Sequence, residues 1–271
     1  MNQVLAALRD APHTSISAIK AYTMCPMKYA HRYVFRTEAS HRSVPLVLGS
    51  AVHEALAAFY THVGEHKEDP PESLVTDTFS TAWDDMLVGD PPVKGDDLGA
   101  EKDMGVSILR AFHESAPRPL KVLAVELPFC MPIIDPKTGS VSDRVIVGAI
   151  DAVVVDEDGR TVLVEHKTAK RRWSQVQLDH DIQPTIYQLA ARHLDLTDNP
   201  TIRFDFLMKQ KKPALVSEEV HRSSEQETEA MVVVRQILRA VDAEVFFPVR
   251  GWACAGCEFA FRCHHPGMGV C

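Results

Sequence analysis

Two runs rich in β-branched residues, joined by a short acidic turn, constrain the fold of this chain most strongly. The first run covers residues 145–155 and the second covers residues 161–168. The five residues between them include the pair Asp158-Gly159, which is typical of a hairpin turn. Both runs are apolar enough to be buried strands, yet each also contains charged side chains, which burial on both faces would disfavour.

The charged residues in question are Asp151, Glu165 and Lys167. Because side chains alternate along a strand, Glu165 and Lys167 are expected on one face of the sheet and His166 on the other. Carboxylates on neighbouring strands can bind a hard divalent cation, and a nearby ammonium can act on a water bound to it. Two carboxylates and an ammonium so arranged suit phosphodiester hydrolysis. A surface hairpin with an ordinary ion pair would contain the same residues and is the alternative interpretation.

Size and charge limit the remaining classes of protein. The 271 residues are 45% hydrophobic, which is enough for one large core. No apolar run approaches the length of a membrane span and no secretion signal is recognisable, so we expect a cytoplasmic protein.

The net charge of −8 argues against a general nucleic-acid coat protein but not against a nuclease, whose metal-binding carboxylates contribute to it. Two basic segments are either solvated faces or DNA contacts: Lys170, Arg171 and Arg172, and Lys209, Lys211 and Lys212.

Six cysteines without a secretion signal argue against a disulfide framework. Cys254 and Cys257 have the spacing of a metal-binding pair, and Cys263 follows closely, so this segment predicts a metal or iron–sulfur site. Cys271 is expected to remain outside such a site because it follows a flexible, glycine-containing tail. Cys130 is expected to be an ordinary core residue.

The order of predicted elements divides the chain into three regions of one integrated domain: a helical region over 1–119, a strand-rich core over 120–222, and a helix with the clustered cysteines over 223–271. Expected helices in the first region are capped by Ser17, restart at Cys25-Pro26, open at Gly49, and cover about 74–87 and 101–114. The segment from Gly64 to Gly99 has no assigned role. We expect an α/β fold with a mixed sheet flanked by helices. The sequence has no glycine-rich phosphate-binding motif, so neither an ATPase nor a dinucleotide enzyme is indicated.

Four motifs occur in a recognisable order: Gly49-Ser50-Ala51-Val52-His53, Gly148-Ala149-Ile150-Asp151, Glu165-His166-Lys167-Thr168 and Gln183-Pro184-Thr185-Ile186-Tyr187. Over residues 15–263 the chain resembles the RecB-type branch of the PD-(D/E)xK nuclease superfamily. It is most similar to members with an iron–sulfur clasp: AddB-type nuclease domains, CRISPR-associated adaptation nucleases and related phage exonucleases. Taken singly, His53 would usually be a core histidine, and Gln183 with Tyr187 the polar edge of a helix.

The resemblance implies a restriction-endonuclease-like core and a role for each motif residue. His53, Asp151, Glu165 and the peptide carbonyl of His166 would bind Mg²⁺ or Mn²⁺, with the histidine favouring Mn²⁺. Lys167 would position or deprotonate the attacking water, and Gln183 and Tyr187 would orient the water, the lysine or the phosphate.

The resemblance further implies that Cys25 joins Cys254, Cys257 and Cys263 around one 4Fe–4S cluster, which would staple the two ends of the chain. The expected function is a metal-dependent DNA exonuclease that prefers single-stranded ends and serves recombination, repair or DNA degradation. DNA is the expected partner, with a helicase or recombination protein as a further candidate. Two alternatives stay open: a catalytically silent subunit that binds DNA ends, and a zinc-ribbon interaction module.

Overall fold

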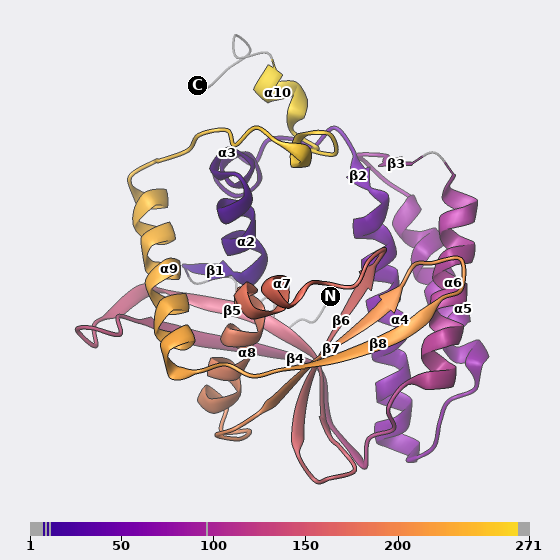
Figure 1. Ribbon diagram of the computed structural model, residues 1–271. Helices are drawn as coiled ribbons and strands as arrows, with labels where there is room; N and C mark the ends of the chain where they lie inside the picture. Colours follow the sequence, from indigo (N-terminus) through magenta and orange to yellow (C-terminus); the bar gives the residue numbers. More distant parts are fainter. Residues whose placement is uncertain (1–7, 9, 11, 96, 265–271) are drawn as a thin grey trace.

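A mixed β-sheet of six strands organises the fold (Figure 1). The computed structural model describes residues 8, 10, 12–95 and 97–264. The strand order is β1-β5-β6-β7-β8, and β4 pairs with β5 as well. The strands are β1 (His13–Ser15), β4 (Lys121–Ile134), β5 (Val141–Val155), β6 (Thr161–Ala169), β7 (Thr201–Met208) and β8 (Ala214–Val220). A separate two-residue pair joins β2 (Arg42–Ser43) to β3 (Val93–Lys94).

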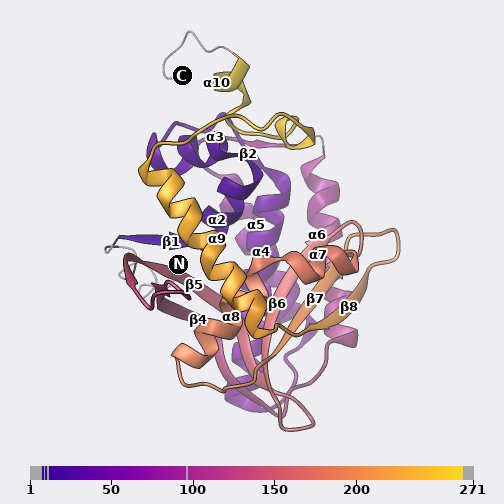
Figure 2. The ribbon, with the colours of Figure 1, turned by 60° about the vertical axis from the view of Figure 1, so that its left-hand side comes forward.

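Helices cover the sheet from two sides (Figures 1 and 2). One group is α4 (Val44–His66), α5 (Glu72–Leu87) and α6 (Leu98–Ser115). The other is α2 (Ile16–Met24), α8 (Ile182–His193) and α9 (Ser224–Asp242). Shorter helices are α3 (Pro26–Tyr29), a π-helical turn (Ala30–Val34), α7 (Gln175–His180), a 3₁₀ turn (Trp252–Cys254) and α10 (Ala260–His264). The predicted mixed α/β class is confirmed.

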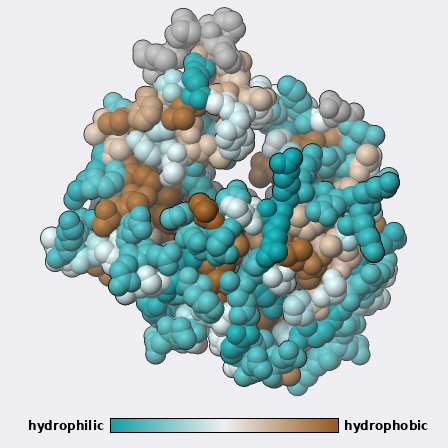
Figure 3. Space-filling model, viewed as in Figure 1, coloured by the Kyte–Doolittle hydropathy of each residue, from teal (hydrophilic) through white to brown (hydrophobic). Residues whose placement is uncertain are grey.

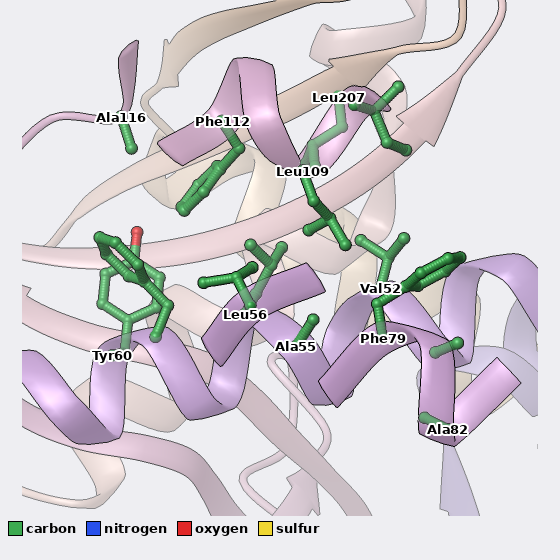
Figure 4. Packing of buried hydrophobic residues seen from close by; sticks show 14 of the residues in the cluster. Val52, Ala55, Leu56, Tyr60, Phe79, Ala82, Leu109, Phe112, Ala116 and Leu207 are labelled. Atoms are coloured by element: carbon green, nitrogen blue, oxygen red, sulfur yellow. The ribbon is translucent and has the colours of Figure 1, made fainter. Parts of the chain in front are cut away.

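Each side of the sheet has its own hydrophobic core. On the first side, α4 packs Val52 and Leu56 against α5 and α6 (Figure 4). The sheet contributes Val154 and Val164 to the same core. On the second side, Leu163 lies among residues of α2, α8 and α9. Adjacent residues of β6 therefore enter opposite cores, which is the alternation expected of a strand buried on both faces.

Helix α4 differs from its prediction. It begins at Val44 rather than near Gly49, and it continues past Gly64 to His66. Of the described helices, it is the one long and apolar enough, by length and composition, to cross a membrane, so the expectation that no segment reaches that length is wrong. Half of the most apolar 18-residue stretch of this helix is buried inside the protein. Burial between the sheet and its neighbouring helices accounts for its apolar character.

Two further expectations need correction. Helix α2 is capped by Ser15 and not by Ser17, because the Ser15 side chain accepts a hydrogen bond of 3.2 Å from the Ala18 N–H. The segment from Gly89 to Gly99, whose prolines and glycines favour a flexible loop, contains the short strand β3. Arg42 explains part of its order, since its guanidinium donates to the backbone carbonyls of Met86 and Pro91.

The sheet divides along one edge of β5. β4 pairs with β5 along almost its whole length, so β1 and β6 must share the opposite edge. β1 pairs with residues 145–147 and β6 with residues 152–155. Residues 148–151 are left between these two ladders, at the point where β6 separates from β5. We call this place the fork.

Candidate active site

Asp151 lies at the fork and is held there by the strand that leaves it. Its Oδ2 accepts a hydrogen bond of 2.8 Å from the backbone N–H of His166 on β6. The β5–β6 ladder ends at the pair Ala152–Val164, so the backbone N–H of His166 has no partner on β5. The Asp151 carboxylate accepts its hydrogen bond instead. The side chain is only 11% exposed, so its position is fixed by the sheet rather than by solvent.

Glu165 and Lys167 project from the other side of β6 relative to His166, as strand alternation predicts. The Lys167 ammonium donates to Glu165 Oε1 and also to Gln183 Oε1 at 3.1 Å. Burial alone would lower the pKa of Lys167, but the Glu165 carboxylate outweighs burial and the pKa is raised. The lysine is therefore a stable cation at neutral pH.

Gln183 and Tyr187 lie one turn apart on α8 and extend this network. Gln183 Nε2 donates to the Tyr187 hydroxyl at 3.1 Å, and that hydroxyl lies 2.6 Å from Glu165 Oε2. Burial, reinforced by the Glu165 charge, raises the pKa of Tyr187 well above its ordinary value, so the hydroxyl remains a donor. The structure therefore brings both helix residues to the carboxylate and the ammonium of β6.

Gly148 has a packing reason to be glycine. A Cβ built on it would lie 2.5 Å from the ring of Phe129, the residue paired with it on β4. The Phe129 ring in turn packs edge-to-face against Tyr187, with 6.1 Å between ring centroids. The close approach of strand and ring thus supports the position of Tyr187 beside Glu165.

Two histidines approach Asp151 from the side of α4. His53 Nδ1 lies 3.3 Å from Asp151 Oδ1, and His166 Nδ1 lies 3.3 Å from Asp151 Oδ2. Burial would lower the pKa of His53, but the adjacent Asp151 raises it to about 9. Burial likewise opposes ionisation of Asp151, yet His53 and the hydrogen bonds to it lower its pKa. In the metal-free protein, His53 and Asp151 therefore form a charged pair.

Two residues at the site were missed by the sequence prediction. Glu126 on β4 has a carboxylate oxygen within 4.8 Å of donor atoms of both His53 and Asp151, and burial raises its pKa to about 7. Lys20 on α2 donates to Gln183 Oε1 at 3.0 Å and pairs with Asp181 at 2.8 Å. Its pKa is lowered by burial, against the attraction of Asp181. In the sequence, Glu126 is a single acid within an apolar strand and Lys20 a single lysine on an apolar helix. Neither belongs to a motif that would have marked it as a site residue.

A cavity of about 590 Å³ lies beside the fork. Its lining combines Asp151, Glu165 and Lys167 with Lys20 and Tyr33 from the helices opposite. Figure 3 shows this face of the molecule hollowed at its centre, between the part built by α2 and α3 and the part built by α4. The catalytic candidates are thus partly buried yet reachable from solvent.

A sequence model of the PD-(D/E)XK nuclease superfamily matches residues 13–264. The chain belongs to this superfamily. No curated protein matches it. Among solved structures, the protein named "Putative exonuclease" from Eubacterium rectale shares 15% identity with a TM-score of 0.55, over 96% of this chain and 90% of its own. SSO0001 also shares 15% identity, over 90% of this chain and 92% of its own, with a TM-score of 0.37, too low to support an argument. At such identity, likeness to the first structure shows the fold alone.

The donor set of the nuclease suits the divalent cations that this superfamily uses. Among the described His, Cys, Asp and Glu residues, one group of three has ligand atoms that all lie within 4.8 Å of one another. Its members are His53, Glu126 and Asp151. Carboxylate oxygens suit Mg²⁺ and Mn²⁺, and an imidazole nitrogen shifts the preference toward Mn²⁺. Glu165 is nearby but engaged: one of its oxygens accepts from Lys167 and the other from Tyr187.

The two basic segments of the nuclease meet in space. β6 and β7 run parallel with Ala169 beside Met208, so the residues that follow each strand are neighbours, and the Lys209 N–H donates to the Ala169 carbonyl at 2.7 Å. Two of these side chains have acidic partners: Arg172 pairs with Glu218, and Lys209 lies 4.0 Å from Glu101. The exposed residues are Lys170, Arg171, Arg172, Lys211 and Lys212.

The four cysteines expected to share a ligand line one cavity, which we call the cysteine cavity: Cys25, Cys254, Cys257 and Cys263. Cys25 is the residue between α2 and α3, and Pro26 follows it in the first turn of α3. Phe259 is buried against the cavity, whereas Trp252 is 86% exposed. Cys271 lies outside the described residues.

Proposed function

We propose that this nuclease is a metal-dependent DNA exonuclease that acts on single-stranded ends. The observation that carries the proposal is the convergence of Asp151, Glu165 and Lys167 at the fork, within one solvent-reachable cavity. Two carboxylates and an ammonium on adjacent strands match the chemistry of phosphodiester hydrolysis in this superfamily. The hydrogen-bonded network around them argues for a site that is positioned before substrate arrives.

His53, Asp151, Glu165 and the peptide carbonyl of His166 are the proposed metal ligands. A bound Mg²⁺ or Mn²⁺ would polarise the scissile phosphate and lower the pKa of a bound water. For Glu165 to take part, it would exchange its contact with Lys167 or Tyr187 for the cation. His53 would lose its proton, because only the neutral imidazole offers a lone pair to a metal.

Lys167 is proposed to orient the attacking water and to offset negative charge on the phosphate. Because Glu165 raises its pKa, the ammonium is a hydrogen-bond donor and not a base at neutral pH. Gln183 accepts from Lys167, and Tyr187 donates to Glu165, so we assign both residues a positioning role. A misplaced ammonium would be costly, since such reactions depend on alignment within about an ångström.

Lys20 is proposed to bind the phosphate backbone. Its ammonium and that of Lys167 contact the same atom, Gln183 Oε1. Two like charges this close repel each other, and each is offset by its own carboxylate, Asp181 for Lys20 and Glu165 for Lys167. An anionic phosphate would relieve this repulsion. The exposed basic residues beyond β6 and β7 are proposed as further, sequence-independent phosphate contacts.

The preference for single-stranded ends is supported by the enclosure of the site. Groups from α2 and from the π-helical turn line the cavity opposite the sheet, so substrate would lie between helices and strands. A single strand fits such an enclosed path more readily than a duplex, because the duplex would have to open first. The resemblance to AddB-type domains adds recombination, repair or DNA degradation as the setting, with a helicase as candidate partner.

A 4Fe–4S cluster is proposed for the cysteine cavity. Four thiols on one cavity are the donor set that such a cluster requires. The proposed role is structural, because the cavity is separate from the fork.

A cleavage assay on three substrates tests the function: end-labelled single-stranded DNA, linear duplex, and a closed single-stranded circle. We expect metal-dependent digestion of the linear single strand, slower digestion of the duplex and none of the circle. Asp151→Asn, purified in parallel, controls for contaminating nuclease. Equal cutting of circle and linear strand would contradict end dependence. Cleavage by wild-type protein in EDTA, or by Asp151→Asn at the wild-type rate, would contradict the metal site at the fork.

A further inference from the structure

Tyr33 brings an exposed aromatic ring to the cavity beside the fork. Two tyrosines line this cavity, Tyr33 and Tyr187. Tyr187 is 2% exposed and its hydroxyl is hydrogen-bonded to Glu165, whereas Tyr33 is 37% exposed. Tyr187 is therefore part of the framework of the site, and Tyr33 is the ring that a bound molecule can reach.

A column of aromatic rings supports the Tyr33 ring. It packs on Tyr29, with 5.1 Å between the ring centroids and 39° between the ring planes. Tyr29 stacks in turn on Phe246 at 6.3 Å and meets the edge of the Tyr22 ring at 5.4 Å. The Tyr22 hydroxyl donates a hydrogen bond to the Val245 carbonyl, which anchors the far end of the column. Because these contacts already restrict Tyr33, little side-chain entropy is lost when a flat ligand stacks on it.

The backbone that carries Tyr33 is also unusual. Residues Ala30–Val34 form a π-helical turn directly after α3. π-Helical turns are rare and are frequently found at functional sites. Tyr29 and Tyr33 are four residues apart, so they remain neighbours on one face of this short helical stretch. The turn thus keeps the two rings in contact while Tyr33 lines the cavity.

The same cavity contains the cations proposed to bind phosphate. Lys20 and Lys167 both line it, and both ammonium groups contact Gln183. Proteins bind single strands by combining cations for the phosphates with aromatic rings on which the bases stack. A nucleotide whose phosphate lies at these two ammonium groups can therefore place a neighbouring base on Tyr33, within one cavity of about 590 Å³.

We propose that Tyr33 is a stacking platform for a nucleobase of the single strand, close to the phosphate bound at the fork. The inference rests on the proposed nuclease function and adds a residue that distinguishes single strands from duplexes. In a duplex the faces of the bases are covered by their neighbours, so only an unpaired strand offers a base to Tyr33 without the cost of unstacking. Every base has a π-face, so we expect little dependence on sequence.

The test compares two labelled strands of equal length and equal backbone charge, oligothymidylate and a fully abasic strand. Their affinities are measured by fluorescence anisotropy in EDTA, which prevents metal-dependent cleavage. Tyr33→Leu should weaken oligothymidylate binding at least about fivefold and change abasic-strand binding by less than about twofold. Tyr33→Phe and Tyr33→Trp keep a ring, so both should bind oligothymidylate within about twofold of wild type. Phe35→Leu is the matched control, since Phe35 is 39% exposed beside the same turn but does not line the cavity.

Three results would overturn the stacking role: wild-type protein that binds oligothymidylate no better than the abasic strand, a Tyr33→Leu variant that loses affinity equally for both strands or for neither, and a loss in Tyr33→Phe as large as in Tyr33→Leu. None of them touches the proposed function, which fails separately if wild-type protein with Mn²⁺ cuts neither single strands nor duplex. If Tyr33→Leu does not fold by circular dichroism, Tyr33→Met takes its place, because methionine lacks a ring and is a good helix former. The same affinity criteria then apply.

Discussion

The fork and the cysteine cavity both gather residues that are distant in the sequence, but they are held in different ways. At the fork, the functional side chains stand on long elements whose neighbours fill two cores, and they hydrogen-bond to one another. At the cysteine cavity, three of the four thiols stand on a three-residue 3₁₀ turn, its flank, and a five-residue helix. The fork is therefore shaped before any ligand binds, whereas the proposed cluster would supply much of what holds the cysteine cavity together.

A few contacts do secure the cavity independently of the cysteines. Met27 N–H donates to the Phe247 carbonyl at 3.1 Å, and Ser40 N–H donates to the Glu258 carbonyl at 3.0 Å. The Glu258 carboxylate also binds Lys28 and Arg32. Substitutions at the fork should accordingly change catalysis with little effect on folding, and substitutions at the cavity should change folding first.

The largest expected effect is on catalysis at the fork. Lys167→Met should lower kcat by about 10²- to 10⁴-fold, because the ammonium that aligns water and phosphate is lost. Single-turnover cleavage of labelled DNA measures this loss, and DNA binding should persist because phosphate contacts are spread over many side chains. Lys137→Met is the control, because Lys137 is exposed and lies outside both basic segments. A Lys167→Met enzyme that cuts at the wild-type rate would remove the lysine from the mechanism.

The second effect concerns folding at the cysteine cavity. Cys254→Ala should abolish the visible absorbance and the iron and sulfide content of anaerobically purified protein. It should also lower the melting temperature by roughly 10 °C, because the cross-link between chain segments more than 200 residues apart is lost. Cys130→Ala, which removes a thiol outside the cavity, should retain the cluster. If the purified protein contains stoichiometric zinc and no iron, the cavity holds a zinc site and the cluster assignment is wrong.

A third and smaller effect separates the two ammonium groups of the fork. Lys20→Met should lower kcat/KM by about tenfold, mainly through KM, because a charge-assisted phosphate contact is removed while Lys167 remains. Lys20→Arg should restore most of the loss, and Mn²⁺ affinity should be unchanged in both. An unchanged KM in Lys20→Met would show that this lysine serves only its ion pair with Asp181.

The smallest effect is on the pH dependence of folding. The folded-state pKa of His53 is raised from 6.5 to about 9, so its charged pair with Asp151 is fully stabilising below about pH 6.5 and is lost as the pH rises through 9. In EDTA, His53→Gln should therefore melt about 2 °C below wild type at pH 6.5 and level with it above pH 9.5. A difference that stays constant with pH would argue against the charged pair.

Strand pattern and spacing predicted much of this site. The hairpin turn at Asp158-Gly159, the two strands beside it and the helix carrying Gln183 and Tyr187 could be inferred because each depends on local residue choice. Glu126 could not, because its position depends on a left-handed φ and on pairing with a strand that follows it by some twenty residues. Lys20 could not either, since its contact with Gln183 spans 163 positions.

The contact between Tyr22 and Val245 has a consequence for the newly made chain. The Tyr22 hydroxyl donates to the Val245 carbonyl at 2.8 Å across 223 positions, and Ile19 on the same helix is packed beneath α9. At translation rates of about 5 to 20 residues per second, α2 would wait roughly 10 to 45 s for these partners to emerge from the ribosome. During that interval its apolar face has to be shielded by something other than its final neighbours. Nascent chains arrested before α9 should therefore recruit chaperones through α2, and a longer chain that includes Val245 should release them.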